Sequence, residues 1–162
     1  MDSSSVRPTD SEINHTVNTY ADTLFRLCFS SLQSTSDAED AVSDTFFKYI
    51  TKAPLFINEE HKKAWLIKVA VNTCKDMHRF RKRNLVAADE EVCSYCSEPE
   101  DRSILEAVMN LPLKYKTVIH LFYIEGYKTD EIAKILSVSP AAVRKRLQYG
   151  RKILKEKYRE DL

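Results

Sequence analysis

The sequence predicts an all-α fold made of two small helical domains joined by a flexible linker, the second a helix-turn-helix domain. Only 2 glycines and 5 prolines occur among the 162 residues, too few turn formers for a many-stranded sheet or barrel. Apolar residues recur every three or four positions in several segments, which is the period of an amphipathic helix. In one acidic stretch in the middle of the chain, apolar residues do not recur with this period. A Rossmann or P-loop fold is disfavoured as well, because neither glycine lies in a phosphate-binding run.

The loss of period divides the chain into four parts. A disordered tail is expected over residues 1–11 and a first helical domain over 12–84. The acidic, non-periodic stretch 85–100 is the expected linker, and a second helical domain covers 101–162. Apolar residues make up 43% of the chain, enough to give each domain a small core.

The first domain is expected to contain three helices. Ser36 and Glu39 have the spacing of a capping box, which predicts that the second helix begins there. Pro54 lies in a loop before the third helix. The expected helices cover about 12–32, 37–51 and 61–83.

The second domain is expected to contain four shorter helices, with start and stop signals between them. Pro112 ends the first and Gly126 stops the second. Thr129 can cap the third, and Ser139 can cap the fourth, with Pro140 at its first position. These helices cover about 104–111, 113–124, 130–136 and the chain from 140 onward.

The formal net charge of +1 hides charged blocks of both signs. Residues 37–44 and 89–101 are acidic, whereas residues 75–84 and 144–159 are basic. Two separated basic blocks suggest two contacts with one polyanion. Each block taken alone is more simply a solvated helix face, but their alternation favours nucleic acid.

The second basic block, residues 144–159, lies in a helix-turn-helix pattern: a short helix, a three-residue turn and a basic helix. The second helix of such a motif projects its first side chains into the DNA major groove. Ser137 begins the turn, where glycine often supplies a left-handed backbone, and Gly150 should weaken the last helix by about 1 kcal/mol relative to alanine. The alternative is a helical hairpin with a solvated basic face. The candidate base-reading side chains are Arg144, Lys145 and Gln148, with Arg146 and Arg151 toward phosphates.

A second candidate nucleic-acid surface lies on the long helix of the first domain. Trp65 and Asn72 precede its basic end, and Phe56 lies in the loop before it. Aromatic rings beside basic residues suit unpaired bases, on which they can stack. From the residues alone, Trp65 is more simply a core side chain, and Asn72 could bond a neighbouring backbone group. The basic end contains Lys75, Arg79, Arg81, Lys82 and Arg83.

Four stretches, in this order and spacing, resemble an extracytoplasmic-function (ECF) type RNA polymerase sigma factor. Together they span most of the chain. They are Asp37–Val42 with Phe46; Ala64–Leu66 with Asn72 and Asp76; Leu111–Pro112 with Lys116 and Val118; and Glu131–Ala133 with Ser139, Val143, Arg146, Leu147 and Arg151.

The resemblance implies a non-catalytic specificity subunit that binds core bacterial RNA polymerase and directs promoter-specific initiation. In the family the acidic helix docks on the clamp helices of the largest polymerase subunit, and the flap is a further polymerase contact. Glutamine is usual where Ser43 stands. An anti-sigma factor commonly holds such proteins inactive, so a partner of that kind is expected. The implied polymerase-binding residues are Asp40, Ser43, Asp44 and Phe47.

The resemblance also implies two DNA contacts. The family captures a flipped base of the minus-ten element between a loop and the long helix, and melts the DNA there. Phe56 and Asn72 stand at the matching positions. The implied minus-ten set is Phe56, Trp65, Asn72, Lys75, Arg79, Arg81, Lys82 and Arg83. The implied set for the minus-thirty-five element, read as a duplex, is Arg144, Lys145, Arg146, Gln148 and Arg151.

Other function classes fit the sequence less well. A stand-alone helix-turn-helix regulator would need a dimerisation helix, and none is evident. A protein-interaction module explains the apolar faces but not the two basic helix ends. An enzyme would need a nucleophile–base pair or a metal cluster, and the sequence supplies neither.

No cofactor or metal is expected. No segment resembles a signal peptide or a membrane span, so a cytoplasmic location without membrane insertion is expected. Cys28 and Cys74 fall on apolar faces and should be reduced core thiols. Cys93 and Cys96 form a single CxxC pair, for which free thiols are favoured over a zinc or redox role. His120 is expected to have no acidic partner nearby in the sequence and to be an ordinary core or surface histidine.

Overall fold

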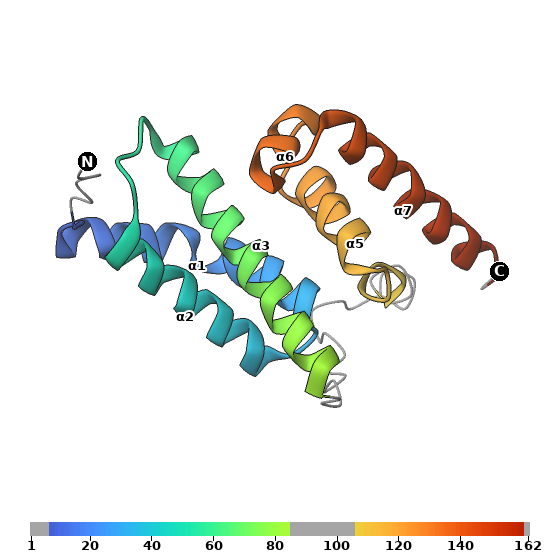
Figure 1. Cartoon of the computed structure of the whole chain (residues 1–162), viewed down its shortest axis with the longest axis horizontal. Coiled ribbons are helices and arrows are strands. Elements are labelled where there is room, and N and C mark those ends of the chain that lie inside the picture. Colours follow the sequence, from blue (N-terminus) through green and yellow to red (C-terminus); the bar gives the residue numbers. More distant parts are fainter. Residues whose placement is uncertain (1–6, 85–105, 161–162) are drawn as a thin grey trace. The chain divides into compact units, whose positions relative to one another are not determined.

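The computed structural model describes residues 7–84 and 106–160, and over these ranges it contains helices and no strands (Figure 1). The chain divides into two compact units, residues 1–87 and 88–162. The predicted all-α class with two helical domains is therefore confirmed. The predicted tail up to residue 6 and the predicted linker lie outside the described residues.

The first unit is built from three helices, α1 (Asp10–Leu32), α2 (Thr35–Lys52) and α3 (Glu59–Asn84). Figure 1 shows α2 and α3 running in opposite directions, joined by the loop over 53–58. Each helix buries one apolar face against the other two, as their three-to-four residue period predicts. The fully buried side chains of this core include Leu24, Leu27, Cys28, Leu66, Ile67 and Ala70.

The starts of α1 and α2 differ from their predicted positions. α1 begins at Asp10, about two residues early, because Thr9 and Glu12 form a capping box: the Thr9 N–H donates to Glu12 Oε2 at 2.8 Å. The predicted capping box of Ser36 and Glu39 is wrong. Gln33 takes a left-handed conformation, with φ 54°, and ends α1, so the next residue is already the N-cap of α2. Ser34 therefore caps α2, where its hydroxyl accepts from the Asp37 N–H at 3.3 Å.

The second unit contains a short helical segment over 106–109, α5 (Leu113–Ile119), a π-helix η1 (His120–Ile124), α6 (Thr129–Leu136) and α7 (Pro140–Glu160). α5 and η1 together fill the single helix expected over 113–124. Gly126 has φ +75° just beyond it, the stop that the sequence predicts. Thr129 is the first residue of α6 rather than its cap, because the residue before it, Lys128, donates its N–H to Glu131 Oε2 at 2.7 Å.

The helix-turn-helix forms as predicted. Ser139 caps α7, since its hydroxyl accepts from the Ala142 N–H at 3.1 Å, and Pro140 opens the helix. Ser137 adopts the left-handed conformation expected of the first turn residue, with φ 56° and ψ 44°. Ile132, Val143 and Leu147 are buried between the two helices of the motif and the rest of the unit.

Gly150 marks the place where α7 packs closely on α5. A Cβ atom at this position would lie 3.1 Å from Ile119 Cγ1 and 3.2 Å from its Cδ1. Helix propensity alone makes glycine unfavourable here, but the small distance between the two helices excludes a larger side chain without movement.

Within residues 7–84 and 106–160, none of the helices combines the length and the apolar character needed to cross a bilayer.

Candidate nucleic-acid and protein interfaces

The outer face of α2 carries all four residues predicted to bind a protein partner. Asp40, Ser43, Asp44 and Phe47 follow the spacing i, i+3, i+4, i+7, so they share one side of the helix. The opposite side is buried. Phe47 is 62% exposed, which is unusual for a phenylalanine and leaves an apolar ring beside two carboxylates. The stripe thus offers charge and apolar area together to a partner protein.

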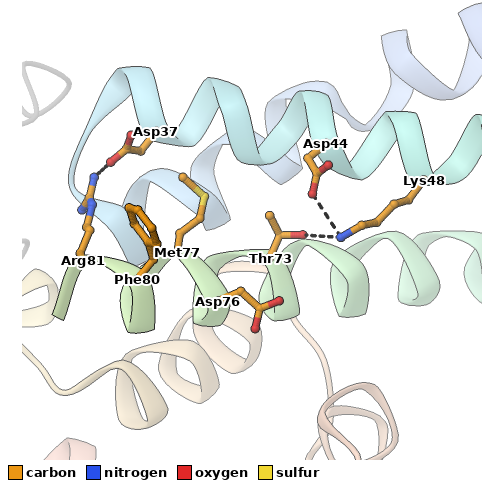
Figure 2. A pocket seen from close by; sticks show the side chains of 8 residues that line it. All are labelled: Asp37, Asp44, Lys48, Thr73, Asp76, Met77, Phe80 and Arg81. Carbon is orange, nitrogen blue, oxygen red and sulfur yellow. Dashed lines mark hydrogen bonds and ion pairs between the residues drawn. The ribbon is translucent and has the colours of Figure 1, made fainter. Parts of the chain in front are cut away.

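A groove of about 450 Å³ lies between α2 and α3, next to this stripe (Figure 2). Lys48 crosses it, because its Nζ lies 3.1 Å from Asp44 Oδ2 and 3.4 Å from Thr73 Oγ1. Met77 and Phe80 contribute apolar surface, and Phe80 is 65% exposed. Asp44 is therefore tied to α3 through Lys48.

Arg81 has a different role from the predicted one. Its side chain is only 17% exposed, forms an ion pair with Asp37 and donates from Nη1 to the Leu32 carbonyl at 2.8 Å (Figure 2 shows the pair with Asp37). His78 Nε2 lies 2.7 Å from the Ser31 carbonyl. The last turn of α1 contains no basic residue of its own, so these α3 side chains cap its carbonyl end. Arg81 therefore ties α3 to α1 and α2 inside the first unit.

The remaining basic residues of α3 lie mainly on its outer surface. Asn72, Arg79, Lys82 and Arg83 are exposed and Lys75 is half-buried. Asn72, Lys75 and Arg79 follow one another at helical spacing and form one stripe. Lys68 is exposed four residues before Asn72 and extends the stripe. The sequence prediction missed Lys68, although its spacing from Asn72 indicates the same face.

The predicted aromatic residues of the minus-ten set form a cluster at the other end of α3. The Phe56 ring centroid lies 6.4 Å from Tyr49, 5.4 Å from His61 and 5.7 Å from Trp65. Phe56 and Trp65 are both half-buried. Asn72 lies seven residues beyond Trp65, about 10 Å along the helix axis.

The pocket that the resemblance implies between Phe56 and Asn72 stays a prediction. Leu55 and Ile57, on either side of Phe56, are 69% and 88% exposed. The sequence prediction did not include them, although three apolar residues in a row within a loop are an unusual pattern.

The first two turns of α7 present the predicted base-reading side chains to solvent. Arg144, Lys145 and Gln148 are exposed, on the side opposite the buried Val143 and Leu147. The structure thus places the three together. Arg146 is half-buried at the edge of this face.

Arg151 is exposed but held in place by aromatic residues of η1. Its Nε donates to the Tyr123 hydroxyl at 2.6 Å. Its guanidinium carbon lies 5.5 Å from the Tyr123 ring centroid and 5.6 Å from that of Phe122. The sequence did not predict Tyr123 as part of this surface.

Two buried polar residues support the second unit from inside. His120 is 2% exposed, and its Nε2 lies 3.4 Å from Glu125 Oε1. The expectation that His120 lacks a nearby acidic partner is wrong, because the wide π turn brings residues five apart onto one side. Lys116 is 3% exposed and donates from Nζ to the Met109 carbonyl at 3.0 Å.

The two described cysteines, Cys28 and Cys74, are free core thiols, as predicted. The hydrogen bond with Cys74 and burial both raise the pKa of Cys28 above its ordinary value, which keeps that thiol protonated. Cys93 and Cys96 lie outside the described residues. In the part of the chain that the structure describes, no three His, Cys, Asp or Glu side chains group as metal ligands would.

Comparison with known proteins identifies a family domain in each unit. Residues 16–84 match the family "Sigma-70 region 2" and residues 101–154 match "Sigma-70, region 4". The chain is 32% identical over 143 residues to RNA polymerase sigma factor SigV of Bacillus subtilis, covering 85% of this chain and 86% of SigV. It is 28% identical over 163 residues to the ECF sigma factor SigW of the same organism, covering 89% and 87% of the two chains.

Two solved structures share the fold. One is the sigma factor RpoE in complex with the anti-sigma factor NepR from Bartonella quintana, with a TM-score of 0.76, 20% identity and coverage of 94% of this chain and 99% of RpoE. The other is CnrH in complex with the cytosolic domain of CnrY, with a TM-score of 0.72, 22% identity and coverage of 95% and 92%. With both sigma regions matched in order, the chain belongs to the RNA polymerase sigma factors of the ECF type, which direct promoter-specific transcription initiation.

Proposed function

We propose that this sigma factor uses three surfaces in initiation. The outer face of α2 binds core RNA polymerase, the outer face of α3 with the preceding loop binds the opened minus-ten element, and the first turns of α7 read the minus-thirty-five duplex. One observation carries the proposal: at the implied positions the side chains lie at least partly exposed, on helices or a loop whose other sides face the two cores. Arg81 is the most engaged of them, because it is ion-paired inside the first unit. The protein acts as a non-catalytic subunit in the cytoplasm, where the polymerase works.

The α2 stripe is suited to a protein partner with a basic surface. Asp40 and Asp44 supply negative charge, and the exposed Phe47 ring supplies the apolar area that interface anchors need. The family resemblance assigns this partner as the clamp helices of the largest polymerase subunit. The same resemblance implies the flap as a further polymerase contact.

The α3 surface is suited to DNA whose strands have parted. Lys68, Lys75 and Arg79 form a positive stripe that can follow the phosphates of one strand. Asn72, in the same stripe, can donate to and accept from the edge of an unpaired base. Flipping a base out of the stack costs a few kcal/mol, which such contacts must offset.

The loop before α3 supplies apolar surface for the same task. Leu55 and Ile57 are exposed beside the half-buried Phe56, which the rings of Tyr49 and Trp65 hold in place. Unpaired bases gain stability from apolar and aromatic contacts that paired bases do not need. We therefore assign base contact to the exposed loop residues and a supporting role to Phe56 and Trp65.

The α7 surface is suited to a duplex. Arg144 and Lys145 can donate to guanine edges, and Gln148 can pair with adenine, in the major groove. A stand-alone helix-turn-helix regulator is not favoured, because a region 2 domain matches the first unit along with region 4 in the second. RpoE was solved in complex with the anti-sigma factor NepR, and we propose that an anti-sigma protein also holds this chain inactive.

Run-off transcription tests the proposal. Bacterial core RNA polymerase is mixed with this protein on templates with randomised upstream sequences, and the transcribed templates are recovered and sequenced. We expect transcripts that depend on the protein and come from templates sharing two separated sequence motifs. Transcripts of equal yield without the protein, or DNA binding by the protein alone at the same sites, would contradict it.

A pair of lysine variants then tests the reading surface. Lys145→Ala should reduce transcription from the selected promoters by about tenfold, because a specific base contact contributes about 1–3 kcal/mol. Lys155→Ala is the matched control, since Lys155 is also exposed on α7 but lies beyond the reading turns. Equal effects of the two substitutions would show that only overall charge matters.

A further inference from the structure

Arg151 is held in an unusually defined position for an exposed arginine. Its Nε donates to the Tyr123 hydroxyl at 2.6 Å, and the guanidinium carbon lies within 5.6 Å of the ring centroids of Tyr123 and Phe122. These contacts all come from η1, on one side of the arginine. An arginine has five N–H donors, and this arrangement uses only the one on Nε. Among the residues that the structure describes, none accepts from the four donors on the terminal nitrogens, which can therefore meet another acceptor.

The π-helix explains how Tyr123 comes to this place. In η1 the Glu125 N–H donates to the His120 carbonyl at 3.2 Å, a bond between residues five apart. His120 and Leu121 are buried and anchor the segment in the core. The Phe122 and Tyr123 rings then meet edge to face at 5.0 Å, and Tyr123 remains 56% exposed. π-Helical turns are rare and occur frequently at functional sites.

We propose that Tyr123 is a positioning residue of the DNA-reading surface, which fixes Arg151 so that its terminal nitrogens meet a backbone phosphate of the bound duplex. Arg151 lies seven residues after Arg144 on α7, so the two arginines project from the same side of the helix. A guanidinium that is already ordered loses less side-chain freedom when it binds a phosphate. The phosphate carries no sequence information, so Tyr123 acts on affinity and register. This inference rests on the proposed function of the second unit.

Tyr123→Phe tests it, because this change removes the hydroxyl and keeps the ring. The holoenzyme carrying this variant should bind a fluorescent selected promoter about three- to tenfold more weakly, as expected for the loss of one hydrogen bond that orders a charged group. Arg151→Ala should weaken binding at least as much and reduce the slope of log affinity against log salt by about one. Tyr149→Phe is the matched control, since it removes another exposed tyrosine hydroxyl from the same unit and should leave affinity unchanged.

The double variant Tyr123→Phe/Arg151→Ala separates positioning from direct contact. If Tyr123 acts through Arg151, the double variant binds no more weakly than Arg151→Ala alone. A further loss in the double variant would overturn the inference, because Tyr123 would then act by itself. Weakening by Arg151→Ala without any effect of Tyr123→Phe would overturn the inference and leave the proposed function standing. No effect of Arg151→Ala would remove both the inference and the phosphate role of Arg151.

Discussion

The two units attach a long basic helix to a small core in different ways. In the first unit, polar side chains of α3 bond to the end of another helix: Arg81 and His78 reach the last carbonyls of α1. In the second unit, α7 approaches α5 by the absence of a side chain at Gly150, and Val143 and Leu147 fill the core. A run of basic residues in a sequence therefore does not reveal how many of its charges are available to a polyanion.

The difference has a functional consequence. At the basic end of α3, Arg81 is ion-paired with Asp37. Fewer positive charges at this end are therefore available to DNA than the number of basic residues indicates. On α7, Arg144 and Lys145 are exposed while the core is built without them. Arg151 is the intermediate case, because it is bonded to the protein and still exposed.

Of the variants that test these two ways of attaching a basic helix, Arg81→Ala is expected to have the largest effect on stability. Removing this side chain takes away the partner of Asp37 and of the Leu32 carbonyl, which should lower the free energy of unfolding of the first unit by about 2–3 kcal/mol. Urea unfolding followed by tryptophan fluorescence measures this unit alone, because Trp65 is the single tryptophan of the chain.

Arg79→Ala provides the control for this prediction. Arg79 is 71% exposed and lies 3.9 Å from Asp76, a surface pair that contributes little. The variant should change the unfolding free energy by less than about 0.5 kcal/mol and instead weaken promoter opening. If both variants unfold at the wild-type urea concentration, Arg81 is not the structural tie described above.

The positions of the helices could be predicted from the sequence, but the contacts between side chains of different helices could not. The period of apolar residues is a local signal that predicts the helices and their buried faces. The cap at Ser139 is likewise predicted by a local signal, the residue type before Pro140. The contacts of Arg81 are with Asp37 and Leu32, which lie far from it in the sequence, and no local pattern indicates that pairing. The position of the Phe56 ring could not be predicted for the same reason, because its contacts with Tyr49 and His61 exist only in the folded chain.

The second mode of attachment, close packing in the second unit, is tested by Gly150→Ala. Alanine favours the helix by about 1 kcal/mol, but its Cβ would lie 3.1 Å from Ile119, and overpacking typically costs about 1–3 kcal/mol. We expect a net loss of about 1 kcal/mol, measured by hydrogen exchange of the α5 and α7 amides. The fluorescence transition of the first unit should not change.

The partner substitution Ile119→Ala shows whether the contact is the cause. The double variant Gly150→Ala/Ile119→Ala should be less destabilised than the sum of the two single variants, because the space left by Ile119 accepts the new methyl group. Additive losses would mean that Gly150 is required for another reason.

A smaller effect, of opposite sign, is expected from Ser137→Gly in the same unit. Ser137 has φ 56°, a conformation that strains residues with a Cβ and that glycine adopts readily. Relief of strain should exceed the extra entropy of glycine in the unfolded chain, for a net gain of about 0.5 kcal/mol. Hydrogen exchange again measures it, and Ser137→Ala, which keeps the strain, should give no gain.

The smallest effect concerns the polar ties at the other end of α3. The Tyr20 hydroxyl donates to Glu59 Oε2 at 2.8 Å, and Lys62 lies 3.1 Å from Oε1; both interactions lower the pKa of Glu59. A carboxyl whose pKa is lowered by folding stabilises the protein above its ordinary pKa, and this contribution is lost as pH falls through the lowered value. Because Glu59 is exposed, the contribution is small.

Glu59→Gln should therefore make the first unit slightly less stable at neutral pH and equally stable at a pH below the lowered pKa of Glu59, as read from the Trp65 fluorescence midpoint in urea. Glu60→Gln, at the exposed neighbouring position, is the control and should follow the wild-type pH profile. The same pH series on the second unit should not respond to Glu59→Gln. A response there would show that the polar ties of the first unit also act on the packing of the second.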